Sequence, residues 1–142
     1  CLEQFGKTLK EEVAKATGKS RDFIETNKSH FRLILQGWGT DFRRELDGKN
    51  YWINKLGVKI LALENVDMVI VPDVRFLNEA QFINEAGGMV IGVTRAGLIP
   101  DNHPSEQEQL LIPCKDTISN DTTLIDLEMR VTTTIKYLKL NE

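Results

Sequence analysis

Residues 66–75 are Val66-Asp67-Met68-Val69-Ile70-Val71-Pro72-Asp73-Val74-Arg75. The first six are mostly apolar and rich in β-branched side chains, a composition typical of a buried strand. Helical spacing follows over residues 77–86, Gly87-Gly88 ends it, and residues 89–94 form a second apolar run. A strand, a helix and a strand within about 30 residues indicate a right-handed parallel crossover. The sequence therefore predicts an α/β fold, with a parallel sheet flanked by helices.

Helical periodicity dominates the chain before this unit. A helix is predicted through residues 9–16, and Gly18 is a suitable stop for it. Ser20 is predicted to cap the next helix, because a serine hydroxyl accepts a hydrogen bond from a free backbone N–H of the first turn. Apolar residues return at helical spacing over residues 51–63. The first half of the chain is therefore expected to be helical.

The remainder of the chain completes the predicted sheet and its cover. Residues 96–113 are polar, contain three of the four prolines, and are expected to form a loop or lid. Residues 115–119 are predicted as a third, short strand, and residues 122–140 as an amphipathic helix. Because no repeat or linker interrupts the chain, residues 1–142 are expected to form a single domain.

Charge, hydropathy and cysteine content indicate which partners the chain lacks and in which compartment it is expected. The formal net charge is −3, from 18 basic and 21 acidic residues, so the chain lacks the basic excess of a general nucleic-acid or membrane-surface binder. No apolar run approaches the roughly 18 residues that a membrane span needs. The two cysteines, Cys1 and Cys114, form neither a disulfide framework nor a metal motif. We therefore expect a cytoplasmic protein that binds neither nucleic acid nor membrane.

The first candidate for chemistry is Asp73 with Arg75. A carboxylate at the carboxyl end of a parallel strand lies where α/β sheets bind ligands, and in phosphoryl transfer it holds Mg²⁺ directly or through water. Arg75 can present a planar fork to a phosphate. The alternative is that Asp73 caps the helix starting near Leu77 and Arg75 is a solvated loop charge.

The second candidate is Gly39-Thr40-Asp41-Phe42-Arg43-Arg44. Gly37-Trp38-Gly39 is expected to break the helix predicted over residues 29–36, and Thr40 to cap the turn that follows. A helix start with arginines makes a reasonable anion site, although an exposed capping turn with solvated arginines is the simpler interpretation.

Two further features add weaker signals. Trp38, Tyr51 and Trp52 could stack on a base, though large aromatic residues at helical spacing usually belong to a core. Arg95, at the end of the second predicted strand, is another potential phosphate ligand.

Several tempting motifs are rejected. His103-Pro104-Ser105-Glu106 fits helix capping better than acid–base chemistry, and His30 and His103 have no spaced partners for a metal. Gly6-Lys7-Thr8 and Gly18-Lys19-Ser20 match only the tail of G-x-x-x-x-G-K-[ST]. Neither has the earlier glycine or a preceding buried strand, so neither is expected to cradle phosphate.

The same motifs, in order, resemble the phage-type deoxynucleoside monophosphate kinases. The runs that carry the resemblance are Phe5 to Val13 with Leu9-Lys10, Leu35-Gln36-Gly37-Trp38-Gly39-Thr40-Asp41-Phe42-Arg43-Arg44, Tyr51-Trp52-Ile53-Asn54, Asp73-Val74-Arg75-Phe76-Leu77-Asn78-Glu79-Ala80, Gly87-Gly88 with the predicted strand to Arg95, His103-Pro104-Ser105-Glu106 and Ile118-Ser119-Asn120-Asp121-Thr122-Thr123-Leu124. They extend over nearly the whole chain. The resemblance implies a P-loop kinase fold with a nucleotide-monophosphate clamp and a mobile lid.

Site roles follow from this resemblance. It implies that Arg44 and Arg75 bind the phosphate of a deoxynucleoside monophosphate and that Asp73 lies near Mg²⁺. It implies that Arg95, at the base of the lid, approaches the phosphoryl group transferred from ATP. Thr40 and Trp52 would help to shape the acceptor pocket.

The chain departs from the family at its beginning, where a strand, a P-loop and a helix are expected. Without the P-loop, most ATP binding would be lost, so we expect these 142 residues to be inactive by themselves. We expect a truncated form of a longer kinase. The alternative is a non-catalytic nucleotide-binding or protein-assembly module that kept the fold.

The missing strand also bears on assembly. In the family it lies between the strands that match residues 66–71 and 89–94, and unpaired backbone groups in a buried sheet are costly. The two strands are therefore expected to pair directly or to borrow a strand from a second copy. An open strand edge favours association, so a homodimer is expected.

Overall fold

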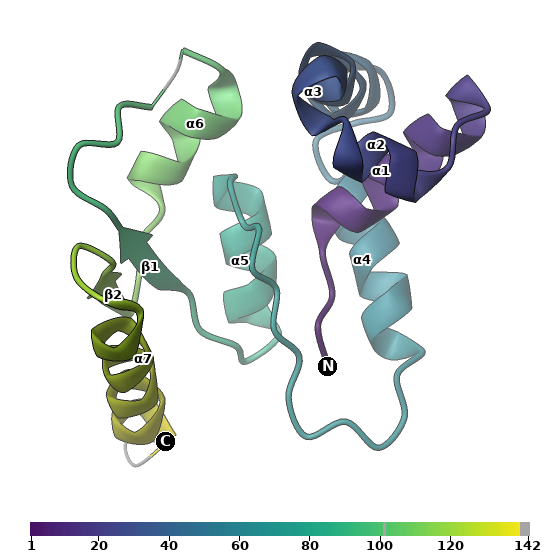
Figure 1. Ribbon diagram of the computed structural model, residues 1–142. Helices are drawn as coiled ribbons and strands as arrows, with labels where there is room; N and C mark the ends of the chain where they lie inside the picture. The colour runs from purple at the N-terminus through teal and green to yellow at the C-terminus, as the bar shows by residue number, and fades with distance from the viewer. Residues whose placement is uncertain (101, 140–142) are drawn as a thin grey trace. The chain divides into compact units, whose positions relative to one another are not determined.

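A computed structural model describes residues 1–100 and 102–139 (Figure 1). The chain divides into two compact units, Cys1–Val74 and Arg75–Glu142, and each is considered by itself. Helices predominate, and a two-stranded parallel sheet accompanies them, which confirms the α/β class. That residues 1–142 form a single domain stays a prediction.

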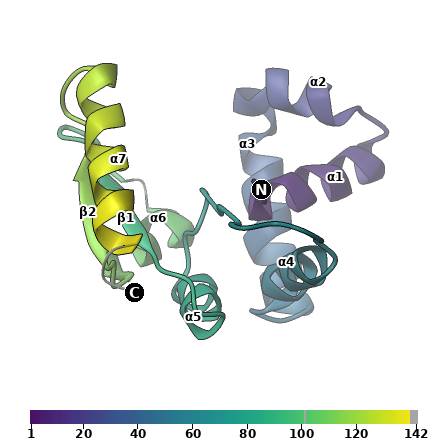
Figure 2. The same ribbon diagram turned by 90° about the horizontal axis from the view of Figure 1, so that it is seen from below.

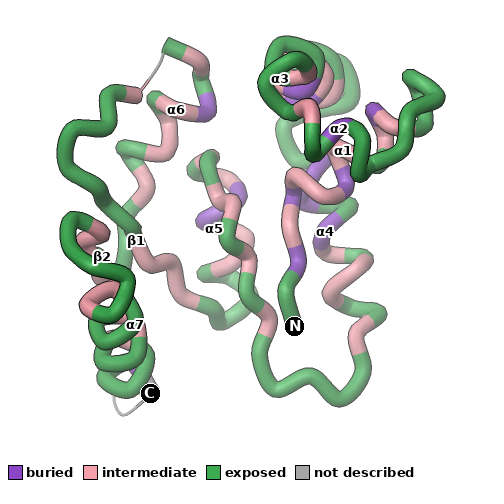
Figure 3. The backbone as a smooth tube through the Cα atoms, in the orientation of Figure 1, coloured by how far each residue is buried: buried purple, intermediate pink, exposed green. Residues whose placement is uncertain are grey.

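The first unit is helical. Its elements are α1 (Phe5–Thr17), α2 (Arg21–Thr26), α3 (Lys28–Gln36), the π-helix η1 (Gly37–Arg44) and α4 (Tyr51–Leu61). Val13, Ile24 and Leu35 form a core between the first three helices, and Leu9 and Trp38 pack against it. Each helix of this unit contains at least one buried residue (Figure 3).

Local signals set the predicted helix ends. Gly18 ends α1 in the left-handed conformation, with φ of 66°, which glycine adopts without the steric cost of a Cβ atom. The Ser20 hydroxyl accepts a hydrogen bond from Phe23 N at 3.1 Å and so caps α2. Both predictions are confirmed.

The expected break at Gly37-Trp38-Gly39 is wrong. The helix continues through these residues in π geometry, and Glu45 N donates to Thr40 O, five residues back. Thr40 therefore lies inside a helical segment instead of capping one. The glycine at position 39 serves close packing, because a Cβ atom there would approach Leu9 Cδ2 to 3.3 Å.

The strand predicted over residues 66–71 is also wrong. Among the described residues, this segment forms only an isolated parallel bridge between Ile70 and Leu2. Ile70 N donates to Cys1 O at 2.8 Å, and Glu3 N donates to Ile70 O at 3.0 Å. Val66, Met68 and Ile70 remain exposed, so the apolar composition does not correspond to a buried strand here.

The second unit holds the sheet. Its elements are α5 (Leu77–Glu85), β1 (Ile91–Thr94), α6 (Pro104–Glu108), the 3-10 turn η2 (Gln109–Leu111), β2 (Asp116–Ser119) and α7 (Leu124–Lys139). β1 and β2 pair in parallel, with Ile91 opposite Asp116 and Thr94 opposite Ser119. α7 runs alongside β2 in both ribbon views (Figures 1 and 2).

Within the second unit, the described partner of β1 is β2. The expected pairing of residues 66–71 with residues 89–94 would join the two units, and it stays a prediction. The region predicted as a loop or lid contains α6 and η2. The predicted end of the last helix at Leu140 lies outside the described residues. None of the helices in the described part combines the length and apolar character needed to cross a membrane.

Candidate functional site

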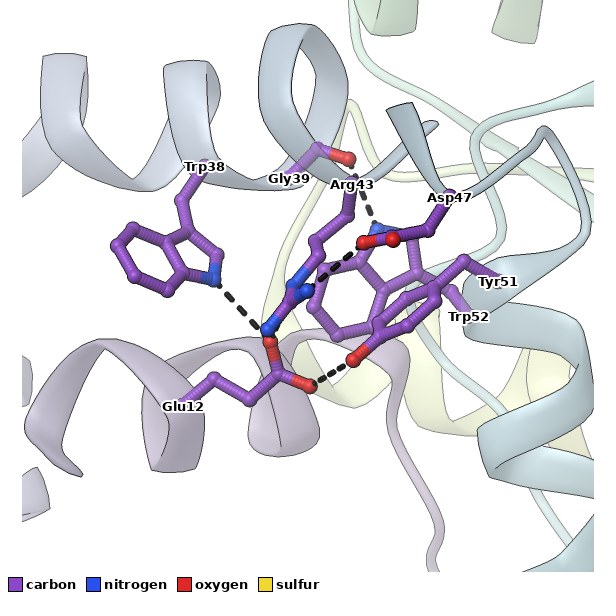
Figure 4. A network of polar contacts seen from close by, with 7 residues as sticks. All are labelled: Glu12, Trp38, Gly39, Arg43, Asp47, Tyr51 and Trp52. Carbon is purple, nitrogen blue, oxygen red and sulfur yellow. Dashed lines mark hydrogen bonds and ion pairs between the residues drawn. The ribbon is translucent and has the colours of Figure 1, made fainter. Parts of the chain in front are cut away.

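A carboxylate at Glu12 gathers three donors in the first unit (Figure 4). Glu12 Oε2 accepts from Trp38 Nε1 at 3.1 Å and from Arg43 Nε at 2.8 Å, and Glu12 Oε1 accepts from the Tyr51 hydroxyl at 2.5 Å. Glu12 lies on α1, Trp38 and Arg43 on η1, and Tyr51 is the first residue of α4. One side chain therefore joins three elements.

Arg43 is held from several directions. Its NH1 group contacts Asp47 Oδ2 at 2.7 Å, in addition to the bond with Glu12. The guanidinium carbon lies 4.8 Å from the ring centroid of Tyr51 and 5.0 Å from that of Phe42, distances at which a cation is attracted to an aromatic face. Arg43 is therefore fixed by ion pairs and rings rather than solvated.

The ionisation of these groups reflects their contacts. Burial of Glu12 favours its neutral form, but hydrogen bonds from Tyr51, Trp38 and Arg43, with the charge of Arg43, outweigh it and lower the pKa. Burial and the bond to Glu12 raise the pKa of Tyr51 to about 12. The bond to Asp47 contributes most to the raised pKa of Arg43. The network is thus held in one charge state around neutral pH.

Three predicted site residues lie on the elements that this network joins. Thr40 and Arg44 belong to η1, and Trp52 is on α4. Trp52 is buried, and its Nε1 donates to Gly39 O at 2.8 Å, which ties α4 to η1. Arg44 is buried with 7% exposure, and its NH1 group donates to Lys49 O at 3.0 Å. The fold of the first unit therefore holds all three on connected elements.

Asp73 makes a contact that neither the predicted Mg²⁺ role nor the predicted cap of the helix near Leu77 included. Its two carboxylate oxygens accept from Phe5 N at 3.1 Å and Gly6 N at 2.7 Å, so it caps the start of α1. The helix at Leu77 is capped by other carboxylates, so the alternative that Asp73 caps it is wrong. Among the described residues, no group of three or more His, Cys, Asp or Glu side chains could hold a metal ion. A magnesium role for Asp73 stays a prediction.

The remaining predicted site residues belong to the second unit. Arg75 NH1 pairs with Glu106 Oε1 on α6 at 2.6 Å, and half of the arginine side chain is exposed. Arg95 directly follows β1 and is exposed. The pKa of Asp121 is lowered, chiefly by a hydrogen bond from Ala96 N, with a smaller contribution from the charge of Arg95. Both arginines are therefore accessible to a ligand.

Helix capping explains the histidine motif. His103 is the N-cap of α6, and its Nδ1 accepts a hydrogen bond from Ser105 N at 3.2 Å. The structural interpretation of this motif is confirmed.

Sequence reasoning missed Glu12. It follows Glu11 on a helix with many charges, and its partners lie 26 to 39 residues later in the chain. No local pattern marks such a residue, because its role arises only when α1, η1 and α4 pack together.

Comparison with known proteins agrees with this arrangement of motifs. The family model described as "Deoxynucleotide monophosphate kinase" matches residues 3–131. The chain belongs to this family. The match includes every predicted site residue and extends through both units.

A viral protein adds to the family match. The chain is 39% identical over 98 residues to a protein of Acanthamoeba polyphaga mimivirus named "Putative deoxynucleotide monophosphate kinase". The alignment covers 61% of this chain and 51% of the viral protein. The chain therefore spans about half the length of that curated relative.

Proposed function

We propose that this chain supplies the acceptor-binding part of a deoxynucleoside monophosphate kinase, which transfers a phosphoryl group from ATP to a deoxynucleoside monophosphate. The observation that carries the proposal is the family match over residues 3–131. Support comes from the first unit, where Thr40, Arg44 and Trp52 lie on packed elements. Catalysis of this kind depends on positioning and charge neutralisation more than on covalent chemistry.

Arginines are proposed to hold the acceptor. Arg44 and Arg75 would bind the phosphate of the monophosphate, because a guanidinium fork matches two phosphate oxygens. Thr40 and Trp52 would shape the pocket, and Arg95 would approach the transferred group.

Asp73 is proposed as the residue nearest to Mg²⁺. Each of its oxygens accepts one backbone N–H, and a carboxylate oxygen has a second acceptor position, so a contact through water fits. When bound, the metal would neutralise charge on the phosphates.

Apart from Arg95 beside the transferred group, no residue of this chain is assigned to the donor phosphates, because the sequence has no G-x-x-x-x-G-K-[ST] loop. We propose that these 142 residues alone bind the acceptor without transferring phosphate.

Calorimetry tests the proposal on wild type and Arg75→Ala. Individual deoxynucleoside 5′-monophosphates are titrated into each, and we expect one or more to bind wild type and to bind Arg75→Ala at least about tenfold more weakly. Arg75 is half exposed and its ion pair lies at the surface, so the substitution should leave the fold intact.

Arg130→Ala is the matched control, since Arg130 is an exposed arginine of the same unit that we place outside the site. Equal heats for wild type and Arg75→Ala would overturn the assignment of Arg75. Absence of binding by wild type would overturn the acceptor proposal.

A further inference from the structure

The bonds that Glu12 makes depend on the π geometry of η1. Trp38 Nε1 and Arg43 Nε both donate to the same oxygen, Glu12 Oε2, although they lie five positions apart. In an α-helix, residues five apart point about 140° away from each other around the axis. In a π-helix, whose hydrogen bonds connect residues five apart, such residues lie on one face. Because both donors reach Glu12 Oε2, these two hydrogen bonds favour π geometry over α geometry in η1.

The register of η1 in turn orients the residues proposed to bind the acceptor. A π-helix turns the chain by less per residue than an α-helix, so conversion of η1 to α geometry would change the direction of the side chains along it. Arg44 directly follows Arg43, and its bond to Lys49 O depends on its present direction. A change of register would therefore move Arg44 most directly.

The far end of the network fixes α4. Tyr51 donates to the other oxygen, Glu12 Oε1, from the first residue of that helix. Trp52, next in the chain, donates to Gly39 O within η1. Glu12 and Gly39 thus connect α4 to α1 and to η1 by two independent bonds.

We infer that Glu12 is a positioning residue for acceptor binding, which holds η1 in its π-helical register and thereby directs Arg44 and Thr40. The inference rests on the proposed function. Glu12 reaches no ligand itself and acts through Trp38, Arg43 and Tyr51. A merely structural role predicts only a loss of folded protein, whereas a positioning role predicts weaker binding by protein that remains folded.

Glu12→Gln tests this inference against the matched control Glu11→Gln. Glu11 is adjacent on α1 and pairs with Lys59 at 3.2 Å, with 43% of its side chain exposed, so both variants remove one charge from the same helix turn. Affinity for the monophosphate that wild type binds is measured by calorimetry, and the folded fraction by circular dichroism. We expect Glu12→Gln to bind at least about tenfold more weakly and Glu11→Gln to bind as wild type does.

Titration of Tyr51 shows whether the network has opened. The chain has two tyrosines, so Tyr137→Phe is the background in which the absorbance of the phenolate reports Tyr51 alone. The groups that face its ring are Glu12, Arg43, Asp47 and Lys55. We expect the pKa of Tyr51 to fall from about 12 toward its ordinary value of 10.0 in Glu12→Gln and to stay high in Glu11→Gln.

The outcomes separate the two ideas. If wild type binds and folded Glu12→Gln binds equally well, the positioning inference is overturned while the proposed function stands. If wild type binds no deoxynucleoside monophosphate, both fall. If Glu12→Gln does not fold, Trp38→Phe removes one donor and keeps an aromatic ring; weaker binding by this variant supports the inference, and unchanged binding overturns it.

Discussion

The carboxylate of Asp73 receives the first two backbone N–H groups of a helix that begins 68 residues earlier in the chain. Gln4, the residue at the N-cap position of α1, makes no side-chain capping bond. A helix start has free N–H groups and a partial positive charge. A carboxylate accepts hydrogen bonds from these N–H groups and interacts favourably with the charge. Gly6 allows this approach, because a Cβ atom there would come within 3.1 Å of Asp73 Oδ2.

Asp73→Ala should therefore destabilise the first unit. We expect a loss of about 1 kcal/mol in the free energy of unfolding, the usual cost of removing a helix cap. Urea unfolding followed by circular dichroism measures it, without added Mg²⁺. Asp67→Ala is the control, because Asp67 is exposed in the same connecting segment. Equal stability of Asp73→Ala and wild type would contradict the capping role.

At the scale of elements, α6 supplies two carboxylates to the start of α5. Glu106 pairs with Arg75, and Glu108 Oε1 accepts from Leu77 N at 2.8 Å. Glu79 completes the cap, because its Oε2 accepts from Arg75 N at 2.8 Å. The short helix α6 thus places the negative charge of Glu106 beside the guanidinium of Arg75, which we propose binds the acceptor phosphate.

Glu106→Gln should strengthen binding of the monophosphate. The phosphate must displace the Glu106 carboxylate from Arg75, and removing that charge frees the guanidinium. Exposed ion pairs contribute up to about 1 kcal/mol, so calorimetry should show an affinity gain of up to about fivefold. Glu128→Gln removes a charge elsewhere in the same unit and should change nothing. Weaker binding by Glu106→Gln would show that the pair organises the site instead of competing for it.

At the scale of the whole molecule, much apolar surface remains uncovered. In the second unit the sheet has only two described strands, and Val93 on β1 is 66% exposed. Leu124, Ile125 and Met129 on α7 are exposed as well. Exposed apolar side chains in such number favour association with another surface.

We therefore expect a homodimer at micromolar concentrations. Burial of apolar side chains and pairing of open strand edges would both favour it. Sedimentation velocity over a range of concentrations measures the association state. A single monomeric species throughout that range would contradict this expectation.

Local chemistry in the sequence determined much of the fold. Gly18 and Ser20 act on backbone groups within a few residues of themselves, so the end of α1 and the start of α2 could be predicted. The strands β1 and β2, the helices α4, α5 and α7, and the α/β class followed from periodicity and composition. The order of motifs was enough to predict the family, which the match over residues 3–131 shows.

Tertiary contacts decided the rest. Residues 66–71 have the composition of a buried strand, but a strand forms only where partners supply its hydrogen bonds, and Leu2 provides a single bridge. The glycines of η1 suggested a break, yet packing against Leu9 and the bonds to Glu12 keep the segment helical. Asp73 and Glu12 acquire their roles from partners between 26 and 68 residues away, and no local pattern encodes such distances.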